Sequence, residues 1–352
     1  MVKRQLKFAG CLATVLVTGV VTAPPSQAGD HYTVHPGESI QKAVDAAEPG
    51  DTVDIAPGVY RESVRIDKPG LTLRGSGEWT VIRPAETRAA NSCGQQGNGI
   101  CVLGTAGHRL RDVGIHSLTV SGFHKNGIWA SETDRLRVRG VTSRDNGQWG
   151  IAQQKSTRGT FLDNSASGNG DAGIFLANTV EEEGGALNTR GARIDRNTVT
   201  GNRIGITVRR ARHLSVDDNE VTGNCAGVFV VGDESRPRAG ALTVNRNNVS
   251  DNNKSCPATK RLPALQGSGI VLTGAEDARV EKNLVRGNVG NSPLSGGIVL
   301  FHSFVKVLNE RHVLEGNVAL DNKPADLANR DTGKTNRFEA NICRTSQPAG
   351  MC

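Results

Sequence analysis

The sequence predicts an all-β fold, a single-stranded right-handed parallel β-helix, because two short motifs return along most of the chain. The first motif is Gly followed by Ile or Val, and its copies at Gly127, Gly150 and Gly173 follow one another at steps of 23 residues. The second motif is Asn, a small apolar residue two positions later and Asn again five positions later. It begins at Asn164, Asn197, Asn219, Asn247 and Asn283. A fixed period of about 22 residues is typical of a solenoid whose coils stack on one another.

The residues after each Gly alternate as they do in a short strand. After Gly205, Ile206 and Val208 share one face. Thr207 and Arg209 lie on the other face. Asn and Gly tolerate the left-handed backbone that tight corners need, and stacked Asn side chains can form ladders between coils. An antiparallel sandwich also has many short strands, but it does not repeat one motif in a fixed register, so the β-helix is favoured.

The branched residues of the Gly-Ile and Gly-Val motifs are expected to point inward. We expect them to stack as one apolar column, with one residue from each coil. The members of this column are Ile128, Ile151, Ile174, Ile206, Val228, Ile270 and Ile298.

A short helix is expected over residues 39–47. Ile40, Val44 and Ala47 fall on one face of such a helix, and Ser39 can cap its start. The helix would cover the open end of the first coil, whose strand edges would otherwise be exposed. It is therefore expected to act as the N-terminal cap of the solenoid.

The first 28 residues have the pattern of a secretory signal peptide. Lys3, Arg4 and Lys7 precede an apolar run over residues 9–22, and a small-residue cleavage site ends at Ala28. The apolar run is too short to span a bilayer, which needs about 20 residues. We therefore expect two parts, a signal peptide over 1–28 and one β-helix domain over 29–352, and a secreted, extracellular protein.

The charge balance gives no indication that the protein binds nucleic acid. The whole chain carries 42 basic and 35 acidic residues, a net charge of +7. The signal segment holds three of the basic residues and no acidic one, so the remainder carries 42 − 3 = 39 basic against 35 acidic residues, or +4. No block of Lys and Arg occurs, so the mild excess would favour an anionic partner only weakly.

Six cysteines remain after the signal segment. An even number in an exported chain indicates disulfides, although six cysteines allow 15 pairings. Pairing sequence neighbours is the simplest scheme, and it joins Cys93 to Cys101, Cys225 to Cys256 and Cys343 to Cys352.

The N-terminal stretch resembles the entry segment of the pectin-lyase-like superfamily of right-handed parallel β-helices, which includes secreted bacterial β-helix repeat proteins. The resemblance rests on residues 32–44, on Gly50-Asp51-Thr52-Val53, on Pro57-Gly58-Val59-Tyr60 and on Leu71-Thr72-Leu73-Arg74-Gly75. It is specific for the fold and uninformative about activity, because the superfamily contains lyases, hydrolases, epimerases, esterases and non-catalytic proteins. The Asp-Pro-His-Asp signature of the alginate epimerases is missing from this sequence.

Longer steps between repeats indicate insertions, and these suggest where a site could lie. They cover residues 179–188, 232–239, 254–267 and 288–296. A row of polar, aromatic and basic residues follows the Gly-Ile strands nearby, and stacked coils would bring its members together in a groove suited to an extended sugar chain. The candidate substrate-binding residues in this row are Trp129, Gln154, Phe175, Asn178 and Asp233. The candidate catalytic residues are Lys155, Arg209, Arg210 and His302.

The resemblance implies a chemistry for the basic residues. Polysaccharide lyases of the superfamily neutralise a uronate carboxylate and abstract the proton beside it, and a Lys or Arg can be the base when neighbouring cations or calcium lower its pKa. Calcium is a candidate cofactor because Glu181, Glu182, Glu183 and Asp233 supply hard oxygen ligands nearby. The alternative is that these charges only solvate an outer face and its loop, and that His302 is a surface histidine.

Two functions stay open at this point. The first is an exported carbohydrate-active enzyme, a polysaccharide lyase acting on an acidic uronate polysaccharide. The second is a non-catalytic β-helix that binds glycan or serves at the cell surface, because no complete catalytic motif of the superfamily is present. In both cases we expect a monomer with a polysaccharide partner and no membrane partner.

Overall fold

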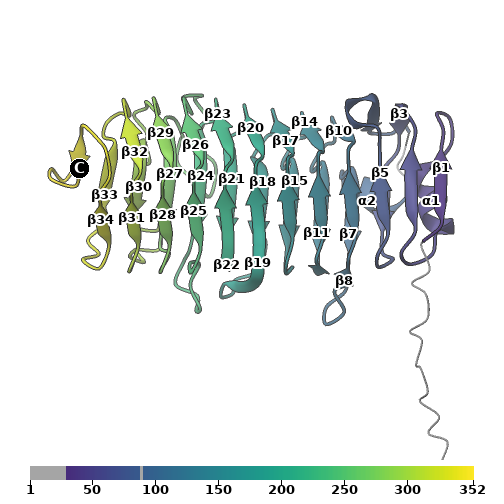
Figure 1. Ribbon diagram of the computed structural model, residues 1–352, viewed down its shortest axis with the longest axis horizontal. Helices are drawn as coiled ribbons and strands as arrows, with labels where there is room; N and C mark the ends of the chain where they lie inside the picture. Colours follow the sequence, from purple (N-terminus) through teal and green to yellow (C-terminus); the bar gives the residue numbers. More distant parts are fainter. Residues whose placement is uncertain (1–28, 88–89) are drawn as a thin grey trace, which may run out of the picture.

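The computed structural model describes residues 29–87 and 90–352, so the predicted signal peptide lies outside the described residues. The described chain forms one parallel β-helix, in which successive coils stack from the end that carries α1 (Ile40–Ala46) to the C-terminus (Figure 1). Each regular coil supplies one strand to each of three long sheets, which we name sheets A, B and C. The predicted fold is therefore confirmed.

Sheet A has 12 strands, sheet B has 10 and sheet C has 11. Sheet A consists of β1 (His31–Val34), β2 (Thr52–Ile55), β5 (Thr72–Arg74), β9 (Gly114–His116), β13 (Arg137–Arg139), β16 (Thr160–Leu162), β19 (Leu187–Asp195), β22 (Ala211–Asp217), β25 (Thr243–Asn245), β28 (Arg279–Glu281), β31 (Val313–Glu315) and β34 (Arg337–Glu339). Sheet B consists of β3 (Gly58–Arg61), β6 (Thr80–Arg83), β10 (Thr119–Ser121), β14 (Thr142–Arg144), β17 (Ser165–Ser167), β20 (Thr198–Thr200), β23 (Glu220–Thr222), β26 (Asn248–Ser250), β29 (Leu284–Arg286) and β32 (Val318–Leu320). Sheet C consists of β4 (Val64–Ile66), β7 (Ile100–Leu103), β11 (Ile128–Ser131), β15 (Ile151–Gln154), β18 (Ala172–Ala177), β21 (Ile204–Arg209), β24 (Ala226–Val231), β27 (Ser268–Thr273), β30 (Gly296–Phe301), β33 (Leu327–Arg330) and β35 (Ser346–Gln347).

Three shorter elements and one strand pair lie outside these sheets. The strand pair is β8 (Leu110–Arg111) with β12 (Thr133–Asp134). The three shorter elements are α2 (Ser92–Gln95), the 3-10 turn η1 (Gly77–Trp79) and α1, which contacts β1, β2 and β4 at the first coil. Ser39 caps α1 by accepting a hydrogen bond from the backbone N–H of Lys42. The predicted capping helix is thus confirmed, one residue shorter at each end than expected.

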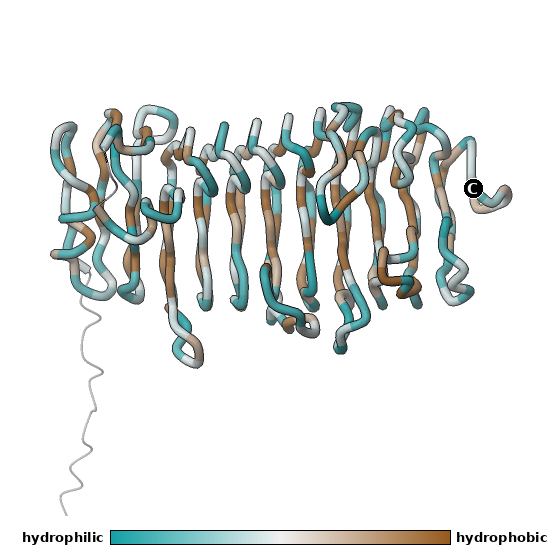
Figure 2. Tube along the Cα trace, turned by 180° about the vertical axis from the view of Figure 1, so that it is seen from behind, coloured by the Kyte–Doolittle hydropathy of each residue, from teal (hydrophilic) through white to brown (hydrophobic). Residues whose placement is uncertain are grey.

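The inward column of sheet C is present as predicted. Ile128, Ile151, Ile174, Ile206, Val228, Ile270 and Ile298 pair in register from strand to strand, and each is fully buried. Figure 2 shows the same pattern along the chain, with hydrophobic residues in the straight strand segments and hydrophilic residues at many corners. Burial of one large apolar side chain contributes about 1.5–3 kcal/mol, so this column is a main source of stability.

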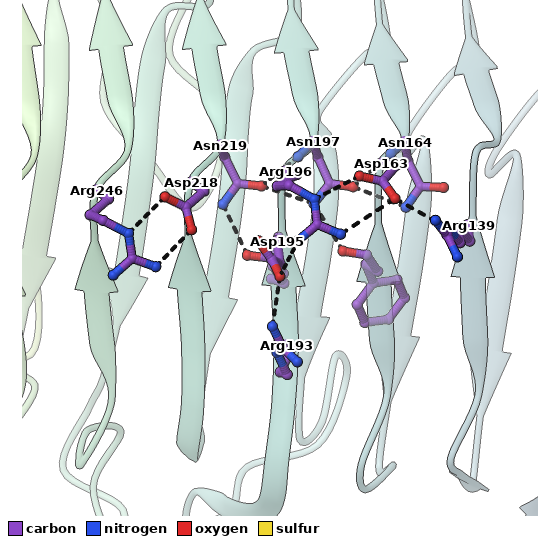
Figure 3. Close-up of polar contacts among 12 residues, drawn as sticks. Arg139, Asp163, Asn164, Arg193, Asp195, Arg196, Asn197, Asp218, Asn219 and Arg246 are labelled. Carbon is purple, nitrogen blue, oxygen red and sulfur yellow. Dashed lines mark hydrogen bonds and ion pairs between the residues drawn. The ribbon is translucent and has the colours of Figure 1, made fainter.

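Two ladders of buried asparagines join the coils at their corners. In the first, the side-chain amide of each Asn donates to Oδ1 of the Asn one coil further on, at 2.9 Å in every step. Its members are Asn164, Asn197, Asn219, Asn247, Asn283, Asn317 and Asn341, of which the first three are labelled in Figure 3. The second ladder runs through Asn146, Asn169, Asn202, Asn224, Asn252, Asn288 and Asn322. The repeated Asn motif is therefore a hydrogen-bonding device between coils.

The second ladder ends on a carboxylate. Asp326 Oδ1 accepts the side-chain amide of Asn322 at 3.0 Å, and Oδ2 accepts the backbone N–H groups of Arg344 and Thr345. An ionised carboxylate has no donor to pass on, so it suits the last position of a ladder. Asp326 thereby ties the C-terminal segment to the last coil.

Arginines and aspartates pair between coils on the outer surface near the first ladder (Figure 3). Arg246 binds Asp218 one coil earlier through two hydrogen bonds of 2.8 and 2.7 Å, and Arg196 binds Asp163 at 2.9 Å. These arginines are therefore paired with carboxylates of neighbouring coils and do not form a free basic surface.

The structure contains three disulfides, Cys93–Cys101, Cys225–Cys256 and Cys343–Cys352, as predicted. Each closes a local segment, and the second ties the 254–267 insertion to the start of β24. Disulfides persist in oxidising compartments, which fits an extracellular or periplasmic protein. No helix among residues 29–87 and 90–352 is long and apolar enough to cross a membrane.

His312 is a buried histidine at a corner near the C-terminal end. Its Nδ1 accepts the backbone N–H of Ala278 at 3.0 Å, and in the next coil Asn336 Oδ1 accepts the backbone N–H of His312 at 3.0 Å. Burial lowers its pKa from 6.5 to about 4. The folded chain therefore holds this imidazole in its neutral form at neutral pH.

We first predict that the Asn219→Ala variant loses about 3 kcal/mol of unfolding free energy, because several buried groups lose their partners at once. Asn219 donates to Asn247 Oδ1 and to the Ile194 carbonyl, and it accepts from the amide of Asn197. Chemical denaturation measures the change. Asn248→Ala is the control, because Asn248 is an exposed neighbour in the same region. Equal stability of the two variants would contradict a structural ladder.

The second prediction concerns pH. The folded pKa of His312 lies below its unfolded value, so between pH 4 and pH 6.5 the unfolded chain binds this proton more readily. The His312 contribution to stability is therefore complete above pH 6.5 and falls by about 3 kcal/mol on acidification to pH 4. Denaturation curves at pH 7 and pH 4.5 measure the loss. His312→Asn should reduce this slope, because an Asn oxygen can accept from Ala278, whereas His108→Asn controls for the loss of an exposed histidine. An unchanged slope in His312→Asn would refute this assignment.

Candidate functional site

A cleft of about 810 Å³ lies on the outer face of sheet C, and we name it the sheet C cleft. Its floor includes Phe175, Thr207 and Phe229, which are register neighbours on β18, β21 and β24. Its walls come from loops at both ends of these strands, namely residues 180–183, 232–234, 259–262 and 303–305. Three of the four predicted insertions thus border one cleft. Residues 288–296 do not line it, and residues 303–305, which the sequence did not indicate, do.

Three aromatic rings are stacked beside the floor. The ring of Trp149 lies 4.1 Å from that of Phe175 and 5.7 Å from that of Trp129, with nearly parallel planes in both pairs. Trp149 is buried and its indole N–H donates to Asp171 Oδ2 at 3.0 Å. Trp149 therefore covers the apolar surface of the coils, whereas Trp129 is partly exposed at the end of the stack.

Arg210 fixes the 179–188 loop and is buried. Its guanidinium donates to the Thr179 hydroxyl at 3.2 Å and to the Glu182 carbonyl at 2.6 Å, and it forms ion pairs with Glu183 and Asp233. All three of its nitrogens are engaged. These contacts join two cleft walls, because Asp233 belongs to the 232–239 insertion.

Arg209 lies next to Arg210 but has different surroundings. It is half-buried in the cleft, and among the described residues its side chain makes one hydrogen bond, to the Val180 carbonyl at 3.2 Å. Among the described residues no carboxylate comes within ion-pair distance of Arg209. Burial lowers the pKa of Arg209, and the charges of Arg210 and Arg261 lower it further. The cleft therefore contains a guanidinium with unused donors that makes no ion pair with any described carboxylate. The charges of Asp233 and Glu183 act on it only from a distance and oppose the lowering of its pKa.

Lys155 occupies the same corner as Arg210, on the other side of the 179–188 loop. The backbone N–H of Lys155 donates to Asn178, and that of Asn178 donates to Arg209, so these residues belong to successive coils. The ammonium group of Lys155 pairs with Glu182 at 2.9 Å. Lys155, Arg209 and Arg210 thus flank one loop on one side of the β-helix, as predicted. Their catalytic roles stay predictions.

Four of the nine predicted site residues line the cleft, and the other five lie outside its lining. Phe175, Arg209, Arg210 and Asp233 line the cleft, whereas Trp129, Gln154, Lys155, Asn178 and His302 do not. The amide of Gln154 donates to Ser131, and that of Asn178 donates to the Gly185 carbonyl. His302 follows β30, is exposed and stacks on Phe301 with ring centres 4.5 Å apart.

The four carboxylates considered for calcium do not fit a cation site. Glu183 and Asp233 both pair with Arg210, Glu182 pairs with Lys155, and Glu181 lies 3.9 Å from Arg261. Each is thus neutralised by a basic side chain. In the described part of the chain no group of three or more His, Cys, Asp or Glu side chains is arranged to hold a metal. Calcium stays a prediction without support from this donor set.

Several cleft residues were missed by the sequence analysis. They are Asp171, Arg203, Thr207, Arg261 and Phe304. Burial raises the pKa of Asp171, although the Trp149 hydrogen bond and the Arg203 charge oppose the shift. Asp171 and Arg203 directly precede the paired strands β18 and β21, so the repeat register could have placed them together. Arg261 and Phe304 come from loops, for which the repeat gives no register.

A third prediction follows from the contacts of Arg210. Replacing Arg210 by Ala should lower the unfolding free energy by about 3 kcal/mol, because it leaves Asp233 partly buried without its counter-ion. The 179–188 loop should also be cleaved faster in limited proteolysis. Arg190→Ala, an exposed arginine on the neighbouring strand β19, is the control. Unchanged proteolysis of Arg210→Ala would show that other contacts hold the loop.

Comparisons with solved structures agree with this architecture. The A-module of mannuronan C-5 epimerase AlgE6 from Azotobacter vinelandii is 18% identical, with a TM-score of 0.61 over 87% of this chain and 90% of that chain. DFA-IIIase from Arthrobacter chlorophenolicus A6 in complex with GF2 is 13% identical, with a TM-score of 0.59 over 89% of this chain and 87% of that chain. At such low identity the similarity shows the fold alone. No curated protein matches this chain significantly.

The family comparison covers more than half of the chain. The model described as "Right handed beta helix region" matches residues 70–239 and 178–311, which together contain most of the regular coils and the sheet C cleft. With the three parallel sheets and the Asn ladders, this match shows that the chain belongs to the family of right-handed parallel β-helix proteins.

Proposed function

We propose that this protein is an exported, carbohydrate-active β-helix enzyme, a polysaccharide lyase that binds an acidic uronate polysaccharide in the sheet C cleft. The observation that carries the proposal is Arg209, a half-buried guanidinium in the cleft without a carboxylate partner. A bound uronate would supply the missing carboxylate through a charge-assisted hydrogen bond. The apolar floor beside it suits the C–H faces of sugar rings.

The proposed reaction is a β-elimination. Pairing of the uronate carboxylate with Arg209 would make the adjacent C–H proton easier to remove. A base takes this proton, the C–O bond to the leaving sugar breaks, and a C=C bond forms, while the leaving oxygen takes a proton from solvent. Lys155 is the candidate base, although it does not line the cleft. To act, it would have to leave its exposed partner Glu182, which is a weak surface pair, and lose its own proton.

The structural neighbours agree with a carbohydrate ligand. One is named a mannuronan epimerase and another was solved with a sugar ligand, GF2. Mannuronan is by its name a uronate polymer. The disulfides fit the proposed export, and a monomeric protein is proposed because one chain contains the whole cleft.

The alternative is a glycan-binding β-helix without activity. Two of the predicted catalytic cations are held in pairs within the protein, Arg210 with Glu183 and Asp233, and Lys155 with Glu182. A cation that is held in an ion pair stays protonated, so Arg210 and Lys155 suit a binding role better than a role as base. Activity and binding measurements on the same polysaccharides separate the two functions.

The fourth prediction tests Arg209. Incubation of the protein with polygalacturonate, alginate and other uronic-acid polysaccharides, with calcium or with chelator, should produce the ultraviolet absorbance of unsaturated ends. Arg209→Ala should reduce kcat/KM about 100-fold, the usual scale for a lost electrostatic contact to the developing charge. Its melting temperature should stay near that of the parent, because Arg209 has no ion pair to lose. Arg190→Ala is the matched surface control.

The outcomes are distinct. Binding of a uronate polysaccharide without turnover would support the glycan-binding alternative. Full activity of Arg209→Ala would show that Arg209 does not bind the uronate carboxylate of the substrate. Absence of both binding and turnover over the whole panel would refute an acidic-glycan function.

A further inference from the structure

The centre of the sheet C cleft floor holds one hydroxyl group that has no hydrogen bond. Thr207 is only 5% exposed, and its Oγ1 has no hydrogen-bond partner among the described residues. Buried polar groups are normally bonded, and an unbonded one lowers stability. A polar group of this kind at a cleft floor therefore points to a partner outside the chain.

The neighbours of Thr207 show which face it occupies. Phe175 and Phe229, its partners in register on both sides, belong to the apolar cluster on the outer face of sheet C. Ile206 and Val208 belong to the inner core. Adjacent strands lie about 4.8 Å apart. Thr207 is thus the one hydroxyl between two phenylalanines on the floor.

Arg209 lies two residues beyond Thr207 on the same strand, β21, and both side chains line the cleft. Residues i and i+2 of a strand share a face and lie about 7 Å apart. A strand-borne hydroxyl and a free guanidinium at this spacing present one neutral and one cationic hydrogen-bonding group over an apolar floor. A single pyranose ring with a carboxylate offers the matching groups over a comparable length.

We infer that Thr207 and Arg209 form one subsite for a single uronate residue. Arg209 binds the carboxylate, and the Thr207 hydroxyl bonds to a hydroxyl or ring oxygen of the same sugar, whose C–H face lies on Phe175 or Phe229. This inference rests on the proposed function and adds the pose of the sugar and a specificity-determining residue. Because Oγ1 is shielded from solvent, this bond requires the Thr207 side chain to take another χ1 rotamer when the sugar binds.

The test uses Thr207→Val, which removes the hydroxyl and keeps the shape of the side chain. Its melting temperature should equal or exceed that of the parent, because an unbonded buried hydroxyl is lost. Its Kd for tetrasaccharides of galacturonate, mannuronate or guluronate, measured by calorimetry, should rise about 3- to 10-fold. Thr207→Ser keeps the hydroxyl and should bind as the parent does.

Ser268 offers a matched control. It is fully buried at the start of β27 in the same sheet, its Oγ also has no hydrogen-bond partner, and it does not line the cleft. Ser268→Ala should therefore change stability only and leave the Kd unchanged. A combined Thr207→Val and Arg209→Ala variant then measures whether the two side chains act on one sugar. Groups that hold one ligand residue should couple by about 2-fold or more.

The binding measurements separate the inference about Thr207 from the proposed function. Parent-like binding by Thr207→Val would overturn the inference and leave the proposed function standing. Fully additive effects in the double variant would overturn the shared sugar residue. If the parent protein binds none of the three tetrasaccharides, the proposed function fails and this inference fails with it.

Discussion

The structure depends first on the buried asparagine ladders. Each Asn side chain accepts from the coil before it and donates to the coil after it, so a coil cannot shift by one residue without unpairing amides in both neighbours. The ladders therefore impose the register that also aligns the inward isoleucines. From Asn146 onward, stacking along one axis then follows, because each coil offers the next the same set of donors, acceptors and apolar side chains.

This register decides where variation can occur. A coil can lengthen only at corners where its extra residues leave the stack, and three insertions do so around the strands β18, β21 and β24 of sheet C. Their positions are then fixed by contacts between loops and scaffold. Arg210 joins the 179–188 and 232–239 insertions, and the Cys225–Cys256 disulfide holds the 254–267 insertion. Because the coils are rigid and the loops are anchored to them, the shape of the cleft is fixed by the fold.

The fold could be predicted from the sequence because its causes are periodic. The Gly-Ile and Asn motifs repeat once per coil, and the three disulfides join sequence neighbours. The site could be predicted only in part. Sequence order placed Arg209, Arg210 and Lys155 around one loop. It could not show that Arg210 and Lys155 pair with carboxylates whereas Arg209 pairs with none among the described residues. In the sequence Thr207 is an ordinary strand residue, and only the structure shows that its hydroxyl has no hydrogen bond.

The contrast between the ladders and the cleft explains how the chain tolerates a costly site. The Asn amides of the two ladders are bonded from coil to coil, whereas the cleft holds an unbonded hydroxyl, a half-buried guanidinium and Asp171, whose pKa is raised by burial. In a solenoid each coil contacts mainly its neighbours, so stability is close to a sum over coils. The regular coils on both sides can therefore stabilise β18, β21 and β24 against the cost of their polar groups. Unbonded buried groups also occur outside the cleft, for example at Asn245 and Ser268, and neighbouring coils stabilise the chain against their cost in the same way.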